Sequence, residues 1–367
     1  MSVGIGIVGL PGSGRTTVFN ALTGGQGTGG HTQDSSAAHI GIAKVPEPRL
    51  EVLASMLHPS KVVPASVTYI DIGASVKGLA TDKGIGGQLL SQLSNVDALI
   101  NVVRAFRDDS IPHIEGSLDI ERDIADMELE LAFSDLTLVE RRLGRIEVSL
   151  KGAKAAERPA LLREQELLWR IKDGLEKGVP VRERALTAEE ARITAGYQFL
   201  TAKPLLIVVN IGEDQLPEAA SLETELNSRY ARPQRRVTTV CGKLEMELAQ
   251  LDDNAAGALR REFGLYEPGA DRVIRLSYEL LGLVSFFTTA SDEVKAWSIR
   301  RDTEAVKAAG KIHSDMEKGF IRAEVVSFDD LVKCGSLAEA RKRGLLRLEG
   351  KSYVVQAGDV ITFLFNV

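Results

Sequence analysis

Residues 9–16, close to the N-terminus, have the types and spacing of a phosphate-binding loop. They read GLPGSGRT, which matches the pattern G-x-x-x-x-G-K-[ST] except that Arg15 stands in place of lysine. Glycines allow backbone N–H groups to turn toward phosphate oxygens, and a helix that starts there adds the positive end of its dipole. The residues that we expect to contact a nucleotide here are Gly9, Pro11, Gly12, Ser13, Gly14, Arg15, Thr16 and Thr17. The alternative is a glycine-rich strand-to-helix turn that holds no ligand.

Arg15 changes the chemistry that this loop can perform. Lysine is a compact point charge that reaches between the β- and γ-phosphates, whereas the guanidinium group of arginine is bulkier and planar. We therefore expect binding through the backbone cradle to survive, and stabilisation of the transferring phosphoryl group to suffer.

Asp71 follows a second apolar run and is a candidate metal ligand. It opens the tetrad DIGA, where GTPases carry D-x-x-G, so that Ala74 stands in place of the glycine. An aspartate at the carboxyl end of a strand beside a phosphate loop holds Mg²⁺, directly or through water. We expect Thr16 and Asp71 to ligate the metal, and Arg15 and Asp71 to be the catalytic residues. The alternative is a strand-end carboxylate without a ligand.

Two further segments are candidates for contacting a purine base. Residues 210–213 read NIGE where GTPases read guanine with N-K-x-D, and Glu213 is one methylene longer than the usual aspartate. Residues 241–243 read CGK where a base-contacting S-A-K loop would lie. The predicted base-contacting residues are Asn210, Glu213, Cys241 and Gly242, without a strict preference for guanine.

The elements that must position these motifs are short apolar strands. We expect strands at residues 3–9, 67–72, 98–103, 204–210 and 236–241, with helical stretches such as 87–93 between them. This alternation predicts an α/β domain with a mostly parallel sheet and helices on both faces. Residues 24–38 are rich in Gly, Ser and Thr and are predicted to form a mobile loop.

Two other segments have different patterns. Between residue 119 and about 200, apolar residues recur at three- and four-residue steps, which predicts an antiparallel helical hairpin inserted in the α/β domain. Its first stripe consists of Leu129, Phe133, Leu136, Val139, Leu143, Ile146 and Leu150. After residue 283, a small α+β unit is expected. Its strands are predicted at 286–289, 296–299, 322–326, 353–355 and 360–365, with a helix at 328–334.

Composition excludes several classes of protein. The net charge of −6 over 367 residues is not that of a basic nucleic-acid binder, although residues 341–347 contain a local basic cluster that is a candidate for RNA contact. Two cysteines cannot make a disulfide framework. No apolar run reaches the roughly 18 residues of a membrane span, and the first ten residues lack the basic start of a signal peptide. We expect a cytoplasmic protein without membrane contact; its oligomeric state stays open, with a monomer favoured.

Beyond these motifs, the sequence resembles the YchF, or Obg-like ATPase, family over essentially its full length. The likeness runs from residues 4–22 through VPEPRL at 45–50 and VVPA at 62–65. It is most specific near the C-terminus, in VKAWSIR (294–300), IHSD (312–315), EKGFIRAEV (317–325) and LEGKSYVVQAGDV (348–360).

The resemblance implies three domains. These are a Ras-like P-loop NTPase domain at 1–120 and 201–282, an inserted α-helical coiled-coil hairpin at 121–200, and a TGS domain with a ubiquitin-like β-grasp at 283–367. It also implies Mg²⁺ with ATP, preferred over GTP, and association with the ribosome or ribosomal RNA in translation or stress regulation.

Departures from the family pattern cluster where catalysis would take place. The substituted positions are Gly12, Arg15, Ala74 and Ser75, the last in place of a hydrophobic residue. Ser35 or Thr32 is the candidate for the Mg²⁺-sensing threonine of the segment before the second motif, and we take Ser35 as the third metal ligand.

Three functions stay open on these grounds. The chain is a slow ATPase or GTPase, a nucleotide-binding module without turnover that acts on the ribosome through its TGS domain and helical hairpin, or a scaffold that binds no nucleotide. Arg15 and Ala74 favour the second over the first, whereas the glycine cradle and Glu213 argue against the third.

Overall fold

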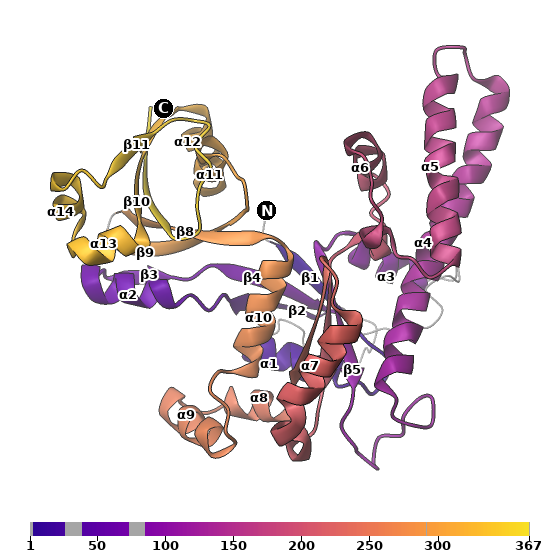
Figure 1. Ribbon diagram of the computed structural model, residues 1–367, viewed down its shortest axis with the longest axis horizontal. Coiled ribbons are helices and arrows are strands. Elements are labelled where there is room, and N and C mark those ends of the chain that lie inside the picture. The colour runs from indigo at the N-terminus through magenta and orange to yellow at the C-terminus, as the bar shows by residue number, and fades with distance from the viewer. Residues whose placement is uncertain (1–2, 26–38, 73–84, 291, 367) are drawn as a thin grey trace. The chain divides into compact units, whose positions relative to one another are not determined.

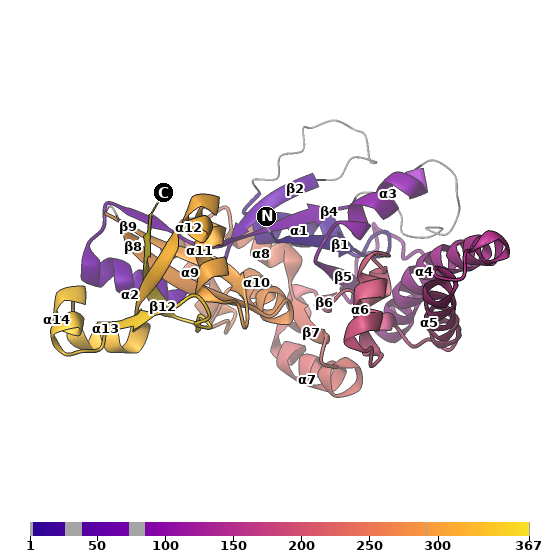
Figure 2. The same ribbon diagram turned by 90° about the horizontal axis from the view of Figure 1, so that it is seen from above.

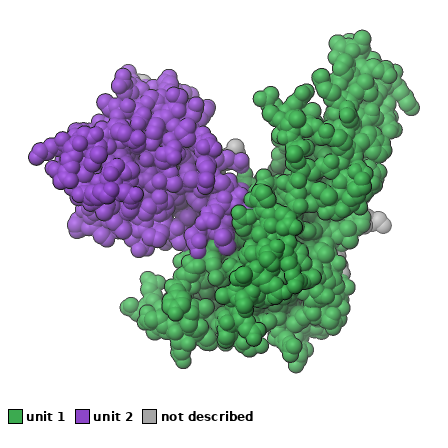
Figure 3. Space-filling view, viewed as in Figure 1, with its two compact units in different colours: residues 1–42, 68–273 green, residues 43–67, 274–367 purple. Residues whose placement is uncertain are grey.

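The computed structural model describes residues 3–25, 39–72, 85–290 and 292–366. The chain forms two compact units (Figure 3). Unit 1 comprises Met1–Ile42 and Thr68–Val273, and unit 2 comprises Ala43–Val67 and Ile274–Val367. None of the helices in the described ranges combines the length and the apolar composition that crossing a membrane requires.

Unit 1 is built on a six-stranded sheet with the order β2-β4-β1-β5-β6-β7. The strands are β1 (Gly4–Val8), β2 (His39–Lys44), β4 (Ser66–Asp71), β5 (Ala98–Arg104), β6 (Leu205–Asn210) and β7 (Arg235–Val240). Neighbouring strands from β4 to β7 are all parallel, so their carboxyl ends lie along one edge of the sheet. The predicted α/β class with a mostly parallel sheet is confirmed, and β2 is an additional edge strand that the sequence pattern did not predict.

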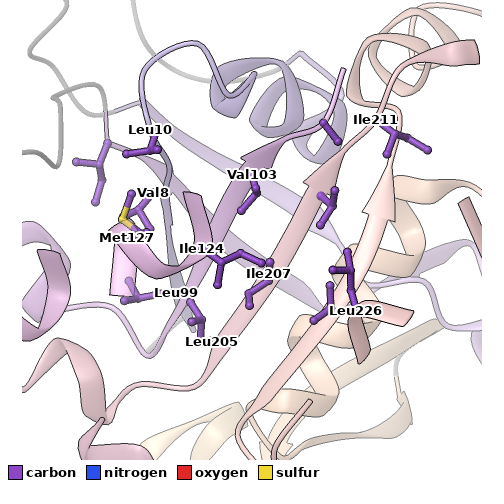
Figure 4. Close-up of a cluster of buried hydrophobic side chains, with 14 of the residues drawn as sticks. Val8, Leu10, Leu99, Val103, Ile124, Met127, Leu205, Ile207, Ile211 and Leu226 are labelled. Carbon is purple, nitrogen blue, oxygen red and sulfur yellow. The ribbon is translucent and has the colours of Figure 1, made fainter. Parts of the chain in front are cut away.

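Helices cover both faces of this sheet. They include α1 (Arg15–Thr23), α3 (Ile85–Ser94), α7 (Ala219–Tyr230), α8 (Gly242–Leu248) and α9 (Asp253–Glu262), while α10 (Gly269–Leu280) spans the boundary with unit 2. Figure 4 shows side chains of β5 and β6, such as Leu99 and Ile207, meeting Ile124 and Met127. Every residue of β5 and β6 is buried, and each fully buried aliphatic side chain stabilises the fold by about 1.5–3 kcal/mol. The sheet is therefore a rigid base for the loops at its edge.

The inserted segment forms the predicted antiparallel pair, α4 (Ile120–Gly152) and α5 (Arg158–Glu176), which lie side by side in Figures 1 and 2. They are followed by η1 (Val181–Glu183), α6 (Ala188–Ala195) and η2 (Leu200–Ala202). In the seam, the buried residues Val139, Leu143 and Ile146 belong to the same cluster as Leu168 and Ile171.

The first part of the predicted stripe on α4 is not in this seam. Leu129 and Phe133 are 53% and 46% exposed. The reason is that the beginning of α4 packs on the sheet through Met127 and Leu131, which turns residues two positions away toward solvent. The apolar stripe therefore changes face along the helix.

Unit 2 contains a second six-stranded sheet, with the order β11-β10-β12-β8-β9-β3. The strands are β3 (Lys61–Val63), β8 (Leu283–Ala290), β9 (Glu293–Arg300), β10 (Phe320–Ser327), β11 (Arg347–Glu349) and β12 (Asp359–Phe365). The pairs β8–β9 and β10–β12 are antiparallel, and β12 runs parallel to β8. The helices are α11 (Ala305–Ile312), α12 (Ser314–Lys318), α13 (Phe328–Cys334) and α14 (Leu337–Lys342). With α11 packed in the core, this arrangement is the expected β-grasp.

Three features of unit 2 differ from the expectations, and the first is the short strand β11, which the sequence pattern did not predict. The strand predicted at 353–355 is only an isolated bridge between Val354 and Glu304. Residues 43–67, which the pattern assigned to the nucleotide-binding domain, pack with unit 2: α2 (Pro48–Leu57) contacts β9, and β3 pairs in parallel with β9. The inserted hairpin groups with the sheet of unit 1, and its status as a separate domain stays a prediction. Of the mobile loop predicted at 24–38, residues 26–38 lie outside the described residues.

Candidate functional site: a phosphate-loop cavity

A cavity of about 710 Å³ opens at the carboxyl edge of the parallel sheet of unit 1. Its walls come from the loops that follow β1, β5, β6 and β7, together with α8. The predicted residues in its lining are Pro11, Gly12, Ser13, Gly14, Arg15, Thr16, Thr17, Asn210, Glu213 and Cys241. Gly9, Asp71 and Gly242 lie directly behind this lining, in contact with its residues. Sites of 300–1,000 Å³ are of the size that holds a small molecule such as a nucleotide.

The phosphate loop has the backbone geometry that its glycines permit. Gly12 and Gly14 have φ values of 78° and 80°, a region that side-chain-bearing residues avoid. A Cβ atom at Gly9 would lie 2.6 Å from the carbonyl oxygen of Val102, and one at Gly14 would clash with Asn210 Nδ2. Gly14 is also the N-cap of α1, so the N–H groups of the first helical turn lie beside the cavity.

Asp71 holds the two side chains that follow the glycines. Arg15 Nε donates to Asp71 Oδ1 at 2.6 Å, and Thr16 Oγ1 donates to Asp71 Oδ2 at 2.8 Å. The Asp71 side chain is 1% exposed. The predicted metal ligands Thr16 and Asp71 therefore lie together, but both carboxylate oxygens of Asp71 already have donors, and one donor is a cation.

Asn210 connects the phosphate loop to the loop after β7. Its Nδ2 group donates to the carbonyl oxygen of Ser13 at 3.0 Å, and its Oδ1 atom accepts from the backbone N–H of Gly242 at 3.0 Å. The side chain is 3% exposed. Asn210 thus connects two backbone segments at the cavity, and its predicted contact with a base stays a prediction.

The far wall of the cavity carries the expected base-contacting groups. Glu213 begins η3 (Glu213–Glu218), and its Oε1 atom lies 3.4 Å from Lys243 Nζ. Both side chains are substantially exposed, so a ligand can reach them. Cys241 is buried at the N-terminus of α8, and burial raises the pKa of its thiol, which makes it a neutral packing residue.

Arg104 is a structural residue of the site that the sequence motifs did not single out. It ends β5, is 3% exposed, and donates to the carbonyl oxygens of Phe106, Asp108 and Ile111 at 3.2, 3.1 and 2.9 Å. Its guanidinium also lies 4.6 Å from the centre of the Phe106 ring. Arg104 thereby shapes the loop that forms one wall of the cavity. The sequence signal that could have identified Arg104 is its position at the end of an otherwise mostly apolar strand.

Several predicted residues lie outside the described ranges. They are Thr32, Ser35, Gly73, Ala74 and Ser75. The role of Ser35 as a metal ligand therefore stays a prediction. Among the residues that the structure does describe, no three His, Cys, Asp or Glu side chains are grouped to hold a metal ion.

The predicted basic cluster of unit 2 is largely neutralised. Arg341 pairs with Glu324 at 2.8 Å, and Arg343 pairs with Glu339 at 2.8 Å. Arg347 lies 3.7 Å from Glu349. These partners reduce the positive charge that the cluster presents. The cluster therefore attracts phosphates less strongly than its sequence alone indicates.

Comparison with known proteins agrees with this architecture. The family model YchF-GTPase_C, described as a protein of unknown function (DUF933), matches residues 283–366. The "Ribosome-binding ATPase YchF" of Bacillus subtilis is 40% identical over 370 residues, covering 100% of both chains. The protein of the same name from Escherichia coli O157:H7 is 38% identical, covering 99% of both. The solved structure of the Schizosaccharomyces pombe YchF GTPase is 28% identical, with a TM-score of 0.83 over 99% of this chain and 98% of that chain. With such similarity over its whole length, the chain belongs to the YchF family.

Proposed function

We propose that this chain binds a purine nucleotide with Mg²⁺ in the cavity beside the phosphate loop, hydrolyses it slowly or not at all, and acts in association with the ribosome. The observation that carries the nucleotide-binding part is the cavity itself. Its phosphate loop has two glycines with positive φ, and Asn210 joins this loop to the opposite wall. Such a loop at a helix N-terminus suits phosphate oxygens.

The residues present fit Mg²⁺. Thr16 Oγ1 and Asp71 Oδ2 are hard oxygen donors 2.8 Å apart, and Mg²⁺ takes one or two such protein ligands with phosphate and water for the rest. Thr16 and Asp71 would hold the ion, directly or through water, and Ser35 is the proposed third ligand. When bound, the ion supplies positive charge to the phosphates.

Slow turnover is proposed from the position of Arg15. In this structure its Nε group is bound to Asp71, and its side chain is only 15% exposed. A guanidinium in that position competes with the metal for Asp71 and is drawn away from the γ-phosphate position that a lysine would reach.

An adenine nucleotide is proposed as the ligand, with GTP as the alternative. The carboxylate of Glu213 accepts hydrogen bonds, and it could accept one from the amino group of adenine. The neighbouring Lys243 Nζ lies 3.4 Å away and offers a donor to a ring nitrogen or a carbonyl. With Asn210 occupied by Ser13 and Gly242, no second side chain in the described lining of the cavity enforces guanine.

Association with the ribosome, and therefore a cytoplasmic location, is proposed from the relatives. The proteins from Bacillus subtilis and Escherichia coli O157:H7 carry the name ribosome-binding ATPase, and the match extends over the whole chain. The alternative is a scaffold that acts through the β-grasp unit without hydrolysis. The pairing of Arg341 and Arg343 with glutamates favours a protein contact over RNA phosphates for that unit.

Calorimetric titration with Mg²⁺-bound ATP, GTP and their non-hydrolysable analogues tests nucleotide binding. We expect micromolar binding of an adenine nucleotide and weak turnover. If none of the nucleotides binds, the nucleotide-binding function is wrong and the scaffold is left.

Sedimentation of the full chain with purified ribosomes, with and without nucleotide, tests the association with the ribosome. A chain that stays at the top of the gradient in both conditions would contradict this association.

A further inference from the structure

A second cavity, of about 280 Å³, lies at the amino edge of the parallel sheet, on the side opposite to the phosphate loop. It is formed by η1 and the residues after it, together with the tight turn that leads into β7. Arg232 and Arg235 exchange backbone hydrogen bonds of 2.9 and 3.0 Å across this turn, which holds both side chains on one short segment. Its charged lining residues are Arg182, Glu183, Arg184, Arg232 and Arg235.

The positive charge of this cavity exceeds its negative charge. Arg182 Nη2 and Arg235 Nη1 donate to the same oxygen, Oε1 of Glu128, at 2.8 and 2.7 Å. One carboxylate therefore serves two guanidinium groups. Glu183 is 3.6 Å from Arg235.

The other two arginines are not neutralised in this way. In the described part of the chain, neither Arg184 nor Arg232 forms an ion pair with a carboxylate. Among the described residues, the Arg232 guanidinium donates to a backbone carbonyl, that of Ala231, at 2.7 Å. Arg184 lies against the backbone of Gly174 in α5. Two guanidinium groups at the cavity wall thus retain donors for an anion.

Arg182 adds a buried positive charge to the cavity wall. Its side chain is 1% exposed, and its Nε group is a buried donor without a hydrogen-bond partner among the described residues. Burial lowers the pKa of Arg182, partly offset by Glu128 and reinforced by the like charge of Arg235. Because the Nε atom is itself buried, Arg182 contributes its charge to the site and not an exposed donor.

We propose that this arginine-lined cavity binds a phosphate group, either free or as the monoester of a small molecule. Guanidinium groups present planar pairs of donors that match phosphate oxygens, and four arginines line this cavity. The volume exceeds what one phosphate needs, since a water molecule takes about 30 Å³, so a sugar-sized group can accompany it. The site is separate from the nucleotide cavity and does not depend on it.

Calorimetric titration of the full chain with inorganic phosphate and with ribose 5-phosphate, at low ionic strength, tests the proposal. Equal affinities identify free phosphate as the ligand, and tighter binding of ribose 5-phosphate identifies a monoester. Hydrogen exchange locates the site: we expect protection at residues 181–186 and 231–236. Protection only at residues 9–17 would show that phosphate binds the phosphate loop alone, and would overturn the proposal.

Substitutions provide the matched comparison. Arg184→Ala and Arg232→Ala should each weaken binding about tenfold, since each removes a guanidinium group that can donate charge-assisted hydrogen bonds to the phosphate. Gln234→Glu adds an anion to the same wall and should weaken binding without removing a packed side chain. Arg163→Ala, which removes an exposed charge from α5, is the control and should change nothing. Unchanged affinity in Arg184→Ala, Arg232→Ala and Gln234→Glu, or no binding of either ligand by the unmodified chain, would overturn the site.

Discussion

Arg15 Nε donates to Asp71 Oδ1 over 2.6 Å, and this ion pair joins the first residue of α1 to the last residue of β4. The pair is almost enclosed, with Asp71 1% exposed and Arg15 15% exposed. It brings together the position where a phosphate loop carries lysine and the carboxylate expected to hold the metal. The departure of this chain from the usual motif therefore has a direct structural consequence at Asp71.

Replacing Arg15 with lysine should increase nucleotide turnover. The shorter, more flexible ammonium group can leave Asp71 for the phosphates, which frees a carboxylate oxygen for Mg²⁺ and restores a charge near the transferring group. We expect kcat for Mg²⁺-ATP to rise about tenfold or more, a gain of about 1.4 kcal/mol in transition-state stabilisation. Phosphate release in steady state measures it.

The control is Arg107→Lys, the same substitution at the rim of the same cavity. It should leave kcat within about twofold, because Arg107 is outside the Asp71 pair. If Arg15→Lys binds nucleotide normally and turns over no faster, Arg15 is not the limiting residue, and the segments around Ser35 and Ala74 become responsible.

Asn210→Ala should destabilise the fold and weaken nucleotide binding together. The substitution leaves the carbonyl of Ser13 and the N–H of Gly242 without their partner in a buried place. We expect the free energy of unfolding in urea to fall by about 1–3 kcal/mol, and nucleotide affinity to fall as the phosphate loop loosens. Asn254→Ala, at an exposed position in α9, should affect neither. Normal stability with lost binding would instead mean that Asn210 contacts the base directly.

Much of the fold was predictable because its signals are local. β5 and β6 are buried over their whole length, so their apolar runs are unbroken, and the glycines at 12 and 14 mark a turn that only glycine adopts readily. By contrast, β3 has three residues and pairs with β9, more than 200 positions later in the chain. No local pattern specifies such a pairing, so the assignment of residues 43–67 to unit 2 could not be predicted.

The sequence predicted which residues form the site better than it predicted the contacts between them. The order of the motifs places Asp71 and Asn210 at strand ends and Thr16 at the start of a helix, where the structure also has them. Sequence could not show that Arg15 would fold onto Asp71, since that depends on the distance between α1 and β4. It also could not identify Arg104, whose partners are backbone carbonyls with no sequence signature.

Arg104→Lys should loosen one wall of the nucleotide cavity. Arg104 uses a different guanidinium nitrogen for each of the carbonyls of Phe106, Asp108 and Ile111, and the single nitrogen of lysine cannot reach all three, so acceptors lose their partners. We expect a loss of about 2 kcal/mol or more in stability and faster proteolysis between residues 105 and 113. Arg107→Lys, three residues along the chain, should leave both properties unchanged. Unaltered proteolysis in Arg104→Lys would mean that the loop holds its shape without this residue.

The buried carboxyl of Asp135 should make stability depend on pH. Burial raises its pKa to about 6, although Leu200 N, Thr201 N and Thr201 Oγ1 donate to it. An unfolded aspartate loses its proton near pH 3.8, so the folded state binds more protons between that pH and about 6. The free energy of unfolding contributed by this group therefore falls, by about 3 kcal/mol, as pH rises through that window, and stays constant above it. Urea unfolding measures this in the wild type and in Asp135→Asn, whose side chain cannot titrate. The free energy of unfolding of the wild type minus that of the variant should fall between pH 4 and 6.5. Asp173→Asn, at an exposed position of α5, is the control. If the difference is constant or rises with pH, Asp135 is ionised throughout and stabilised by its three donors.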